Sequence, residues 1–299
     1  MPGTAPVFLV DSSIYVFRAW FTLPDSLTDR HGRPANAVFG FTDFVYRLID
    51  ERRPSRIGFA FDQSLKTSFR NEIYPPYKAN RESAPEELKQ QFLQCRRFLQ
   101  AAGISEFSSP HYEADDLIGT LARQTRDEGE RLTFVTGDKD LAQLVGAHDT
   151  WWEFARDKRL DYRGVEKQFG VRPEQIADQL AIAGDKVDNI PGVPGVGMAT
   201  AAKLLKRFGT LEDMLADIPA IEHMKIRGAK RLMNLVDEHQ DTIRLARQLT
   251  GIECAADMPD HAPLERGAPD EAALNDWFDE MGISPARRER WRRLLDSPR

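Results

Sequence analysis

Short apolar runs alternate with amphipathic stretches along the first half of the chain. The runs Val7–Val10, Ile57–Phe61 and Leu132–Thr136 have the length and composition of buried strands. The stretches Ala37–Glu51 and Pro85–Ala101 repeat their apolar residues with the period of a helix. Because strands and helices alternate, we expect an α/β fold with a mostly parallel central sheet wrapped by helices.

Strand signals stop near Tyr162, and the second half of the chain shows helical patterns alone. The segment Thr150–Asp161 precedes this change and predicts a last strand and turn. We therefore expect two packed domains, an α/β core over residues 1–161 and an all-helical region over residues 162–299. The helices expected in the second domain are Pro173–Ala183, Met198–Phe208 and Arg227–Leu249.

The composition is that of a globular protein, with 299 residues, 41% hydrophobic and 29% charged. No run of eighteen apolar residues occurs that could span a bilayer. Met1–Pro6 lacks the basic start of a signal peptide, so we expect a cytoplasmic protein. We also expect it to be nucleoid-associated and to act as a monomer. Cys95 and Cys254 are far apart and belong to no C-x-x-C pair, which favours neither a disulfide framework nor a zinc site.

Three of the predicted strands end in an aspartate, namely Asp11, Asp62 and Asp138. The carboxyl ends of parallel strands line one crevice, so these acids should converge there. Converging carboxylates repel one another and lose hydration, unless a cation neutralises them. Any single aspartate among them could instead be a helix N-cap, but three in the same position weaken that alternative.

Further acids follow in three motifs. "HYEADDLIG" places Glu113, Asp115 and Asp116 at the start of a helix, where acids are also favoured by the helix dipole alone. "TGDKDLAQL" adds Asp140, and "GDKVDNIPG" adds Asp185 and Asp188.

The resulting set of nine acids contains no histidine or cysteine, and its all-oxygen chemistry suits Mg²⁺ or Mn²⁺. One Mg²⁺ prefers few carboxylates, so nine suggest two ions, about 3.5–4 Å apart, and phosphodiester hydrolysis. The net charge of −6 argues against a nucleic-acid partner, but setting the nine acids aside leaves 41 basic against 38 acidic residues.

Two segments indicate DNA contact. "KTSFRNEIYPPYKANR" interleaves Tyr74 and Tyr77 with cations, a pattern that suits single-stranded nucleic acid but also a solvated loop. The cations are Lys66, Arg70, Lys78 and Arg81.

The second segment is a Gly-Pro hairpin over residues 184–208, whose loop leads into a helix N-terminus that can hold a phosphate. Its candidate contacts are Gly192, Val193, Gly195 and Gly197, although glycines also serve an ordinary helix-to-helix turn. The arginines of "PARRERWRRLLD" favour a solvated terminal helix over a DNA contact.

Taken together, these motifs resemble the 5′ nuclease family, which includes the N-terminal nuclease domain of bacterial DNA polymerase I, phage 5′ nucleases and flap endonucleases. They occur in the family's order, as "LVDSSIYVFRAW", "GRPANAVFGF", "FDQSLKTSFR", "YPPYKANR", "EADD", "TGDKDL" and "GDKVDNIPGVPGVG". The resemblance implies a structure-specific 5′ nuclease, acting as a 5′-to-3′ exonuclease and flap endonuclease in DNA replication and repair.

The same resemblance assigns roles to residues. It implies a first metal site of Asp11, Asp62, Glu113, Asp115 and Asp116, and a second of Asp138, Asp140, Asp185 and Asp188. It also implies a helical arch over residues 66–92, with Lys78 and Arg81 as catalytic cations and Tyr77 as a base-stacking residue. The hairpin resembles the family's helix-hairpin-helix-like duplex-binding motif and implies a K⁺ site formed by loop carbonyls. Lys186-Val187 departs from the small polar residues usual in this loop.

Other functions remain open at this point. A non-catalytic protein that binds branched DNA would tolerate a broken carboxylate set, which this chain does not have. A metal-dependent ribonuclease could use a similar acidic sheet edge but would lack the hairpin and basic arch. A small-molecule phosphatase would not need the second, helical half. The expected substrate is DNA with 5′ ends or 5′ flaps, and an RNA/DNA hybrid is also possible.

Overall fold

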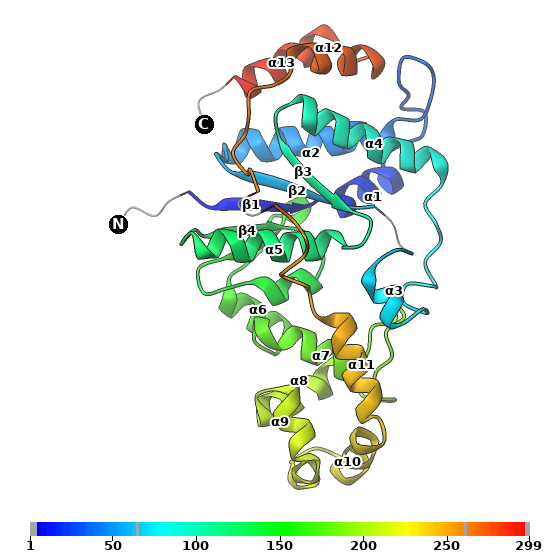
Figure 1. Ribbon diagram of the computed structural model, residues 1–299, viewed down its shortest axis with the longest axis vertical. Helices are drawn as coiled ribbons and strands as arrows, with labels where there is room; N and C mark the ends of the chain where they lie inside the picture. Colours follow the sequence, from blue (N-terminus) through cyan, green and yellow to red (C-terminus); the bar gives the residue numbers. More distant parts are fainter. Residues whose placement is uncertain (1–4, 64–65, 260–261, 297–299) are drawn as a thin grey trace.

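The computed structural model describes residues 5–63, 66–259 and 262–296. Part of the Met1–Pro6 segment considered above therefore lies outside the described residues. A six-stranded sheet crosses the upper half of the molecule, with helices on both faces, and a helical region extends from one face (Figure 1). This arrangement confirms the predicted α/β fold with a C-terminal helical region. Within the described ranges, no helix is both long and apolar enough to cross a membrane.

The sheet has the strand order β3-β2-β1-β4-β5-β6. All neighbouring strands are parallel except β5 and β6, which form an antiparallel hairpin. The chain builds outward from β1 to β2 and β3, and then returns to the other side of β1 for β4. The carboxyl ends of β1 and β4 therefore meet where the strand order reverses, the usual place for a ligand in such a sheet. The strands are β1 Val7–Asp11, β2 Ile57–Asp62, β3 Ser105–Ser109, β4 Leu132–Val135, β5 Thr150–Glu153 and β6 Lys158–Leu160.

Alternate residues of β1 enter two different cores, because successive strand side chains point to opposite faces. Phe8 and Val10 pack on the side covered by α1 (Ser12–Thr22), α2 (Asn36–Arg52) and α4 (Glu86–Ala101). Val7 and Leu9 pack on the side of α5 (Ala114–Asp127) and the helical region. Both faces are buried, which explains why the strand reads as a continuous apolar run.

Between β6 and Thr250 the named elements are all helices, joined by turns and by the loop between α7 and α8. The predicted helix Arg227–Leu249 is two helices, because the chain turns at His239. The α-helices of this region are α6 Tyr162–Phe169, α7 Ile176–Ala183, α8 Met198–Phe208, α9 Leu211–Ala216, α10 Ala229–Glu238 and α11 Gln240–Thr250, with 3₁₀ turns η3 Pro173–Gln175 and η4 Ile218–His223.

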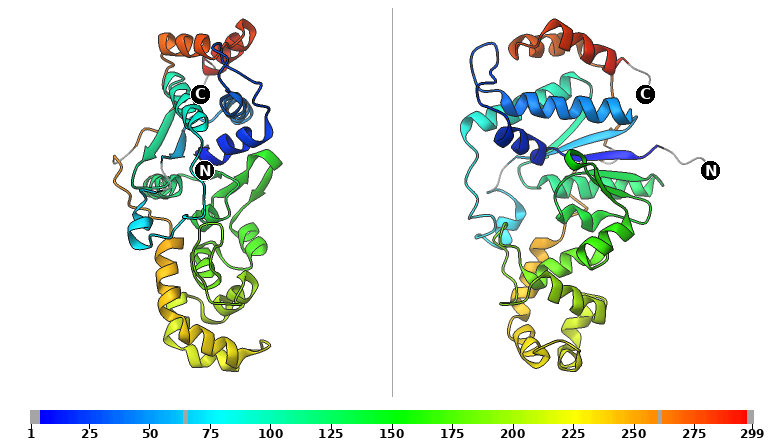
Figure 2. Two further views of the ribbon diagram at one scale, coloured as in Figure 1. Left: turned by 90° about the vertical axis from the view of Figure 1, so that its right-hand side faces the viewer. Right: turned by 180° about the vertical axis from the view of Figure 1, so that it is seen from behind.

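The chain then returns to the α/β core, so the expected helical domain over 162–299 does not hold for its last part. α12 (Glu271–Glu280) packs on α4, and α13 (Pro285–Leu295) packs on α2. Trp277 and Trp291 are buried there with the residues of α2 and α4, which accounts for this packing. Both views of Figure 2 place these helices at the end of the molecule opposite α8–α10.

The expected helical arch over residues 66–92 is only partly helical. It contains the short α3 (Phe69–Ile73), then turns and irregular backbone to Pro85, and then the start of α4. Pro75 and Pro76 explain the interruption, because proline disfavours helix at its own position and before it.

Candidate active site

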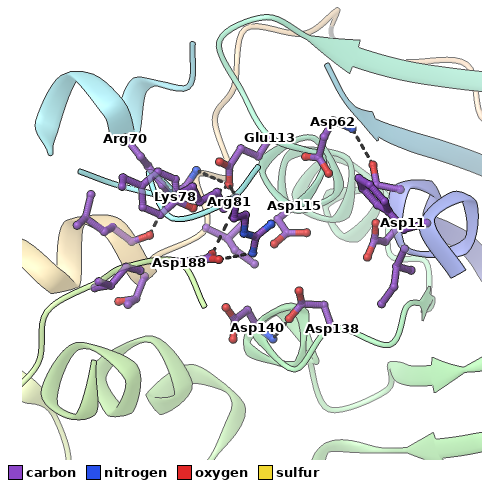
Figure 3. A pocket seen from close by; sticks show the side chains of 18 residues that line it. Asp11, Asp62, Arg70, Lys78, Arg81, Glu113, Asp115, Asp138, Asp140 and Asp188 are labelled. Carbon is purple, nitrogen blue, oxygen red and sulfur yellow. Dashed lines mark hydrogen bonds and ion pairs between the residues drawn. The ribbon is translucent and has the colours of Figure 1, made fainter. Parts of the chain in front are cut away.

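The aspartates that end the strands lie at the point where the strand order reverses. Asp11 is the last residue of β1, Asp62 is the last residue of β2, and Asp138 follows β4. Figure 3 shows their carboxylates facing a common opening. The hydroxyl of Thr136 donates to Asp11 Oδ2 at 2.9 Å and accepts from the Asp138 amide at 2.8 Å, so it ties the ends of β1 and β4 together.

The start of α5 supplies acids that point in two directions. Glu113 is the N-cap of the helix, and Glu113 and Asp115 line the opening. Asp116 is fully buried behind it and does not line it. The prediction that Asp116 binds a metal does not fit this arrangement, because its carboxylate pairs with Arg70, at 2.7 Å to each nitrogen.

The last acids come from the two loops below the sheet. Asp140 follows Asp138, whose Oδ1 accepts from the Asp140 amide at 2.8 Å. Asp188 reaches the opening, whereas Asp185 does not line it. Asp185 instead accepts from Lys139 at 2.8 Å and from the Val187 amide at 2.7 Å.

The structure thus gathers seven of the nine predicted acids around one pocket of about 190 Å³. As the side chains stand, no three histidine, cysteine or acidic side chains in the described part of the chain are close enough to hold one ion. The seven acids are Asp11, Asp62, Glu113, Asp115, Asp138, Asp140 and Asp188.

The electrostatics of the pocket favour a bound cation. Burial, then the neighbouring Asp62 and Asp138, raise the pKa of Asp11 to about 7. Burial and Asp138 likewise raise the pKa of Asp140 to about 7, and burial with three aspartates raises the pKa of Asp115 well above its usual range. In the described structure the buried Oδ1 of Asp140 has no hydrogen-bond partner. Such carboxylates are stabilised by a hard divalent cation, so the residues fit the predicted metal chemistry.

Two cations close the pocket on the side of the predicted arch. Lys78 Nζ lies 2.9 Å from Glu113 Oε2 and 3.8 Å from Asp188 Oδ2, and Arg81 forms an ion pair with Asp188 (Figure 3). Burial alone would raise the pKa of Glu113, but Lys78 and Arg70 outweigh it and lower that pKa. Lys78 and Arg81 therefore lie among the acids of the pocket.

The packing of this segment on the Gly-Pro hairpin was not predicted from the sequence. The Lys78 amide donates to Asp188 O at 2.9 Å, and the Asn189 side chain donates to Pro76 O at 2.7 Å. Asn80 donates to Lys186 O at 3.0 Å, so the unusual Lys186-Val187 pair contributes main-chain carbonyls to this contact. Lys139 was also missed, although its place between Asp138 and Asp140 was a usable signal.

Two predicted DNA contacts are corrected by the structure. Tyr77 is 3% exposed and donates its hydroxyl to Glu113 Oε2 at 3.0 Å, so its ring offers no stacking surface. Arg70 is 3% exposed and its guanidinium is held by Asp116 and backbone carbonyls, so it does not present a charge to DNA. Lys66 does lie on the surface, beside a hollow of about 430 Å³ that Lys78 and Arg81 also line.

The hairpin glycines have distinct backbone roles. A Cβ on Gly192 would lie 2.2 Å from the Gly184 amide nitrogen, so this close crossing requires glycine. Gly195 has φ +77° at the loop tip, and Gly197 is the N-cap of α8. The Val193 side chain is buried, so only its main chain is available to a ligand.

The arginine-rich α13 lies away from this pocket. Arg290 stacks 4.7 Å from the Tyr46 ring centroid, and Arg288 pairs with Asp279 at 2.6 Å. These local contacts agree with the preference for a terminal helix over a DNA contact.

Known structures share the fold. A bacteriophage T5 exonuclease protein crystallised with metal ions is 19% identical, with a TM-score of 0.67, covering 92% of this chain and 97% of that chain. The T5 flap endonuclease solved with DNA and metal ions is 17% identical, with a TM-score of 0.63 and coverage of 97% and 98%. The catalytic core of Rad2 with a DNA substrate is 16% identical, with a TM-score of 0.64 and coverage of 97% and 92%.

Curated relatives are closer in sequence. The chain is 38% identical to DNA polymerase I of Bacillus caldotenax over 273 residues, which is 90% of this chain and 29% of that protein. It is 39% identical to DNA polymerase I of Pseudomonas aeruginosa over 288 residues, 93% of this chain and 31% of that protein. The chain thus spans about a third of the length of these relatives.

Two family models divide the chain between them. Residues 6–170 match the 5′-3′ exonuclease N-terminal resolvase-like domain, and residues 171–272 match the 5′-3′ exonuclease C-terminal SAM fold. These matches confirm the resemblance drawn from the motifs. The chain is therefore a member of the 5′-3′ exonuclease family, to which the nuclease region of DNA polymerase I also belongs.

Proposed function

We propose that the chain hydrolyses phosphodiester bonds in DNA that carries a 5′ end or a 5′ flap, using two divalent ions, with Mg²⁺ the natural choice. The observation that carries this proposal is the gathering of seven carboxylates in one pocket at the reversal of strand order. Family membership supports the reaction, and the relatives that are bacterial DNA polymerases support a role in DNA replication and repair.

The acids divide by position. Asp11, Asp62, Glu113 and Asp115 come from β1, β2 and the start of α5, and we assign them to a first ion. Asp138, Asp140 and Asp188 come from the other side of the pocket, and we assign them to a second ion. Asp185 pairs with Lys139 next to this site and does not line the pocket. Bound there, such ions lower the pKa of an attacking water and stabilise the departing oxygen.

We assign the binding of the scissile phosphate to the two cations of the pocket. Lys78 and Arg81 pair with Glu113 and Asp188, so these side chains already stand beside the carboxylates that would hold the ions. With the carboxylates neutralised by bound ions, both cations would be able to bind the scissile phosphate and the displaced 5′ strand.

The Gly-Pro hairpin would hold the duplex. The loop leads from Gly192 to the N-cap Gly197, so the first amides of α8 point out of the helix end toward a phosphate. We also assign a K⁺ ion to the carbonyls of this loop. Because residues 76–80 hydrogen-bond to residues 186–189, a duplex on the hairpin lies next to the arch segment.

The experiment is cleavage of a 5′-flap duplex labelled at its 3′ end, with Mg²⁺ and with chelator. We expect products at the junction, or stepping in from the 5′ end, with Mg²⁺ only. The double variant Asp138→Ala/Asp140→Ala should bind the flap duplex and leave it uncut, while the exposed Asp25→Ala serves as the matched control with normal cleavage. Binding without any cleavage by the starting protein would favour a non-catalytic branched-DNA-binding protein.

A further inference from the structure

We propose that Arg70 and Asp116 form a buried positioning pair, in which Asp116 binds no metal and instead fixes the catalytic acids of α5 against the helical region. This inference rests on the proposed metal-dependent cleavage. It gives Asp116 a different task from its neighbour Asp115, although both belong to the same acidic motif.

The Asp116 carboxylate has no lone pair left for an ion. Its Oδ1 accepts from Arg70 at 2.7 Å and from the Glu253 amide at 2.9 Å. Its Oδ2 accepts from Arg70 at 2.7 Å and from the Glu113 amide at 3.0 Å. A carboxylate offers about four acceptor sites, so these four bonds saturate it. Metal coordination by Asp116 would require breaking at least one of them inside a fully buried cluster.

The Arg70 guanidinium is equally committed. Besides its two bonds to Asp116, it donates to Leu249 O at 3.0 Å and to Gly251 O at 2.8 Å. Its remaining side faces Glu113, with Nη1 3.6 Å from Oε2. Burial would lower the pKa of Arg70, but the bonds and charge of Asp116 outweigh it, so the guanidinium stays charged.

The pair therefore joins three elements that are far apart in sequence. Arg70 belongs to α3, Asp116 to α5, and the two carbonyls to the end of α11 and the segment after it. Leu249 also lines the active-site pocket. Because Asp116 holds the Glu113 amide, and Arg70 adds positive charge beside the Glu113 carboxylate, the pair sets the place of that acid relative to the helical region.

The functional consequence is an effect on kcat. Side chains that orient metal ligands typically change metal affinity or activity by about 10–100-fold when they are replaced. Loosening the pair should shift Glu113 and the α11 junction, while the DNA contacts of the arch and hairpin remain. We therefore expect a fall in kcat with little change in KM.

The test compares R70Q, D116N and the double variant R70Q/D116N with D115N. Each single change leaves one buried charge without its partner, whereas the double change leaves a neutral amide pair that can still hydrogen-bond. We expect the double variant to melt at a higher temperature than either single variant. We expect it to bind as many Mn²⁺ ions as the starting protein, counted by electron paramagnetic resonance, whereas D115N binds fewer or at least tenfold more weakly.

At a temperature where the double variant is folded, kcat on the 5′-flap duplex should fall about 10–100-fold, with KM changed by less than about threefold. The control is R126Q/D149N, a pair at the other end of α5 with a buried aspartate and a partly exposed arginine, where Arg126 Nε donates to Asp149 Oδ2 at 3.1 Å. That variant should keep its kcat. Both pairs join an arginine to a buried aspartate through one residue of α5. They differ in the exposure of the arginine and in their distance from the pocket.

Two results would overturn the inference. Loss of a Mn²⁺ ion in R70Q/D116N, as in D115N, would make Asp116 a ligand. A kcat no lower than that of R126Q/D149N would make the pair a purely structural tie. If the starting protein neither cleaves nor binds Mn²⁺, the proposed function is wrong whatever the role of this pair. The melting temperatures of the single and double variants then test separately whether Arg70 and Asp116 stabilise each other.

Discussion

Asp11→Asn should stabilise the metal-free protein, even though it removes a central residue of the proposed metal site. Asp11 is 6% exposed and lies near Asp62 and Asp138. Its burial and the negative charges of these two aspartates together raise its pKa from the ordinary 3.8 to about 7. Asparagine has the same shape, carries no charge and can still accept the hydrogen bond from Thr136.

The sign and size of the effect follow from proton linkage. The folded-state pKa lies above the unfolded one, so the folded protein binds the proton more tightly and loses stability as the pH rises from 3.8 to about 7. At 1.36 kcal/mol for each pKa unit, the ionised Asp11 costs about 4 kcal/mol at pH 8 and about 2 kcal/mol at pH 5.5. The variant should regain up to these amounts.

The assay is urea unfolding in chelator at pH 5.5 and pH 8, with Asp25→Asn as the matched change at an exposed position. Asp25→Asn should change the unfolding free energy at neither pH. With saturating Mg²⁺ the order should reverse, because the starting protein then gains binding energy that Asp11→Asn lacks. An Asp11→Asn protein that is no more stable than the starting protein at pH 8 in chelator would refute the electrostatic account of the pocket.

Two further changes test the cations and the hairpin. Lys78→Met should slow cleavage at saturating Mg²⁺ at least about tenfold and weaken its salt dependence, because one phosphate contact is lost, and an unaltered rate and slope in a salt titration would contradict the role of Lys78. Gly192→Ala should lower the melting temperature and the flap-duplex affinity more than Gly195→Ala, since its Cβ would meet the Gly184 nitrogen at 2.2 Å. Gly195→Ala meets nothing within 4 Å and carries only the cost of its φ of +77°, about 1 kcal/mol. Equal losses in thermal melting and in duplex titration would show that the close crossing of the hairpin is not needed.

The sequence was most informative where a local pattern decides the structure. The runs that became β1, β2 and β4 are apolar and bounded by an aspartate, so both the strands and the acids at their ends could be predicted. The strand β3 was missed because Ser105–Ser109 contains a single large apolar residue and shows no alternation. This segment is a strand because it forms hydrogen bonds with β2, and this long-range pairing cannot be recognised in the sequence of β3 alone.

Tertiary contacts explain why the exposure of two residues was wrongly predicted. Arg70 and Tyr77 stand in a segment rich in cations and prolines, where exposure is the natural expectation. Their burial depends on Asp116, Glu113 and the end of α11, which approach from 36 or more residues away in sequence. No pattern within the segment indicates these partners. The distinction between Lys78, whose ammonium pairs with Glu113, and Arg70, whose guanidinium is held by Asp116, therefore came only from the fold.

The nine acids differ in the protein cations that face them, and this difference supports two ions over one. Asp116 is neutralised by Arg70 and Asp185 by Lys139, while Glu113 and Asp188 share Lys78 and Arg81. In the described part of the chain, the other five carboxylates have no lysine or arginine within 4 Å. Burial and neighbouring aspartates raise the pKa of three of them, Asp11, Asp115 and Asp140. One divalent ion would leave most of that charge unbalanced, whereas two supply four positive charges against five. The five are Asp11, Asp62, Asp115, Asp138 and Asp140, and they span both halves of the proposed site.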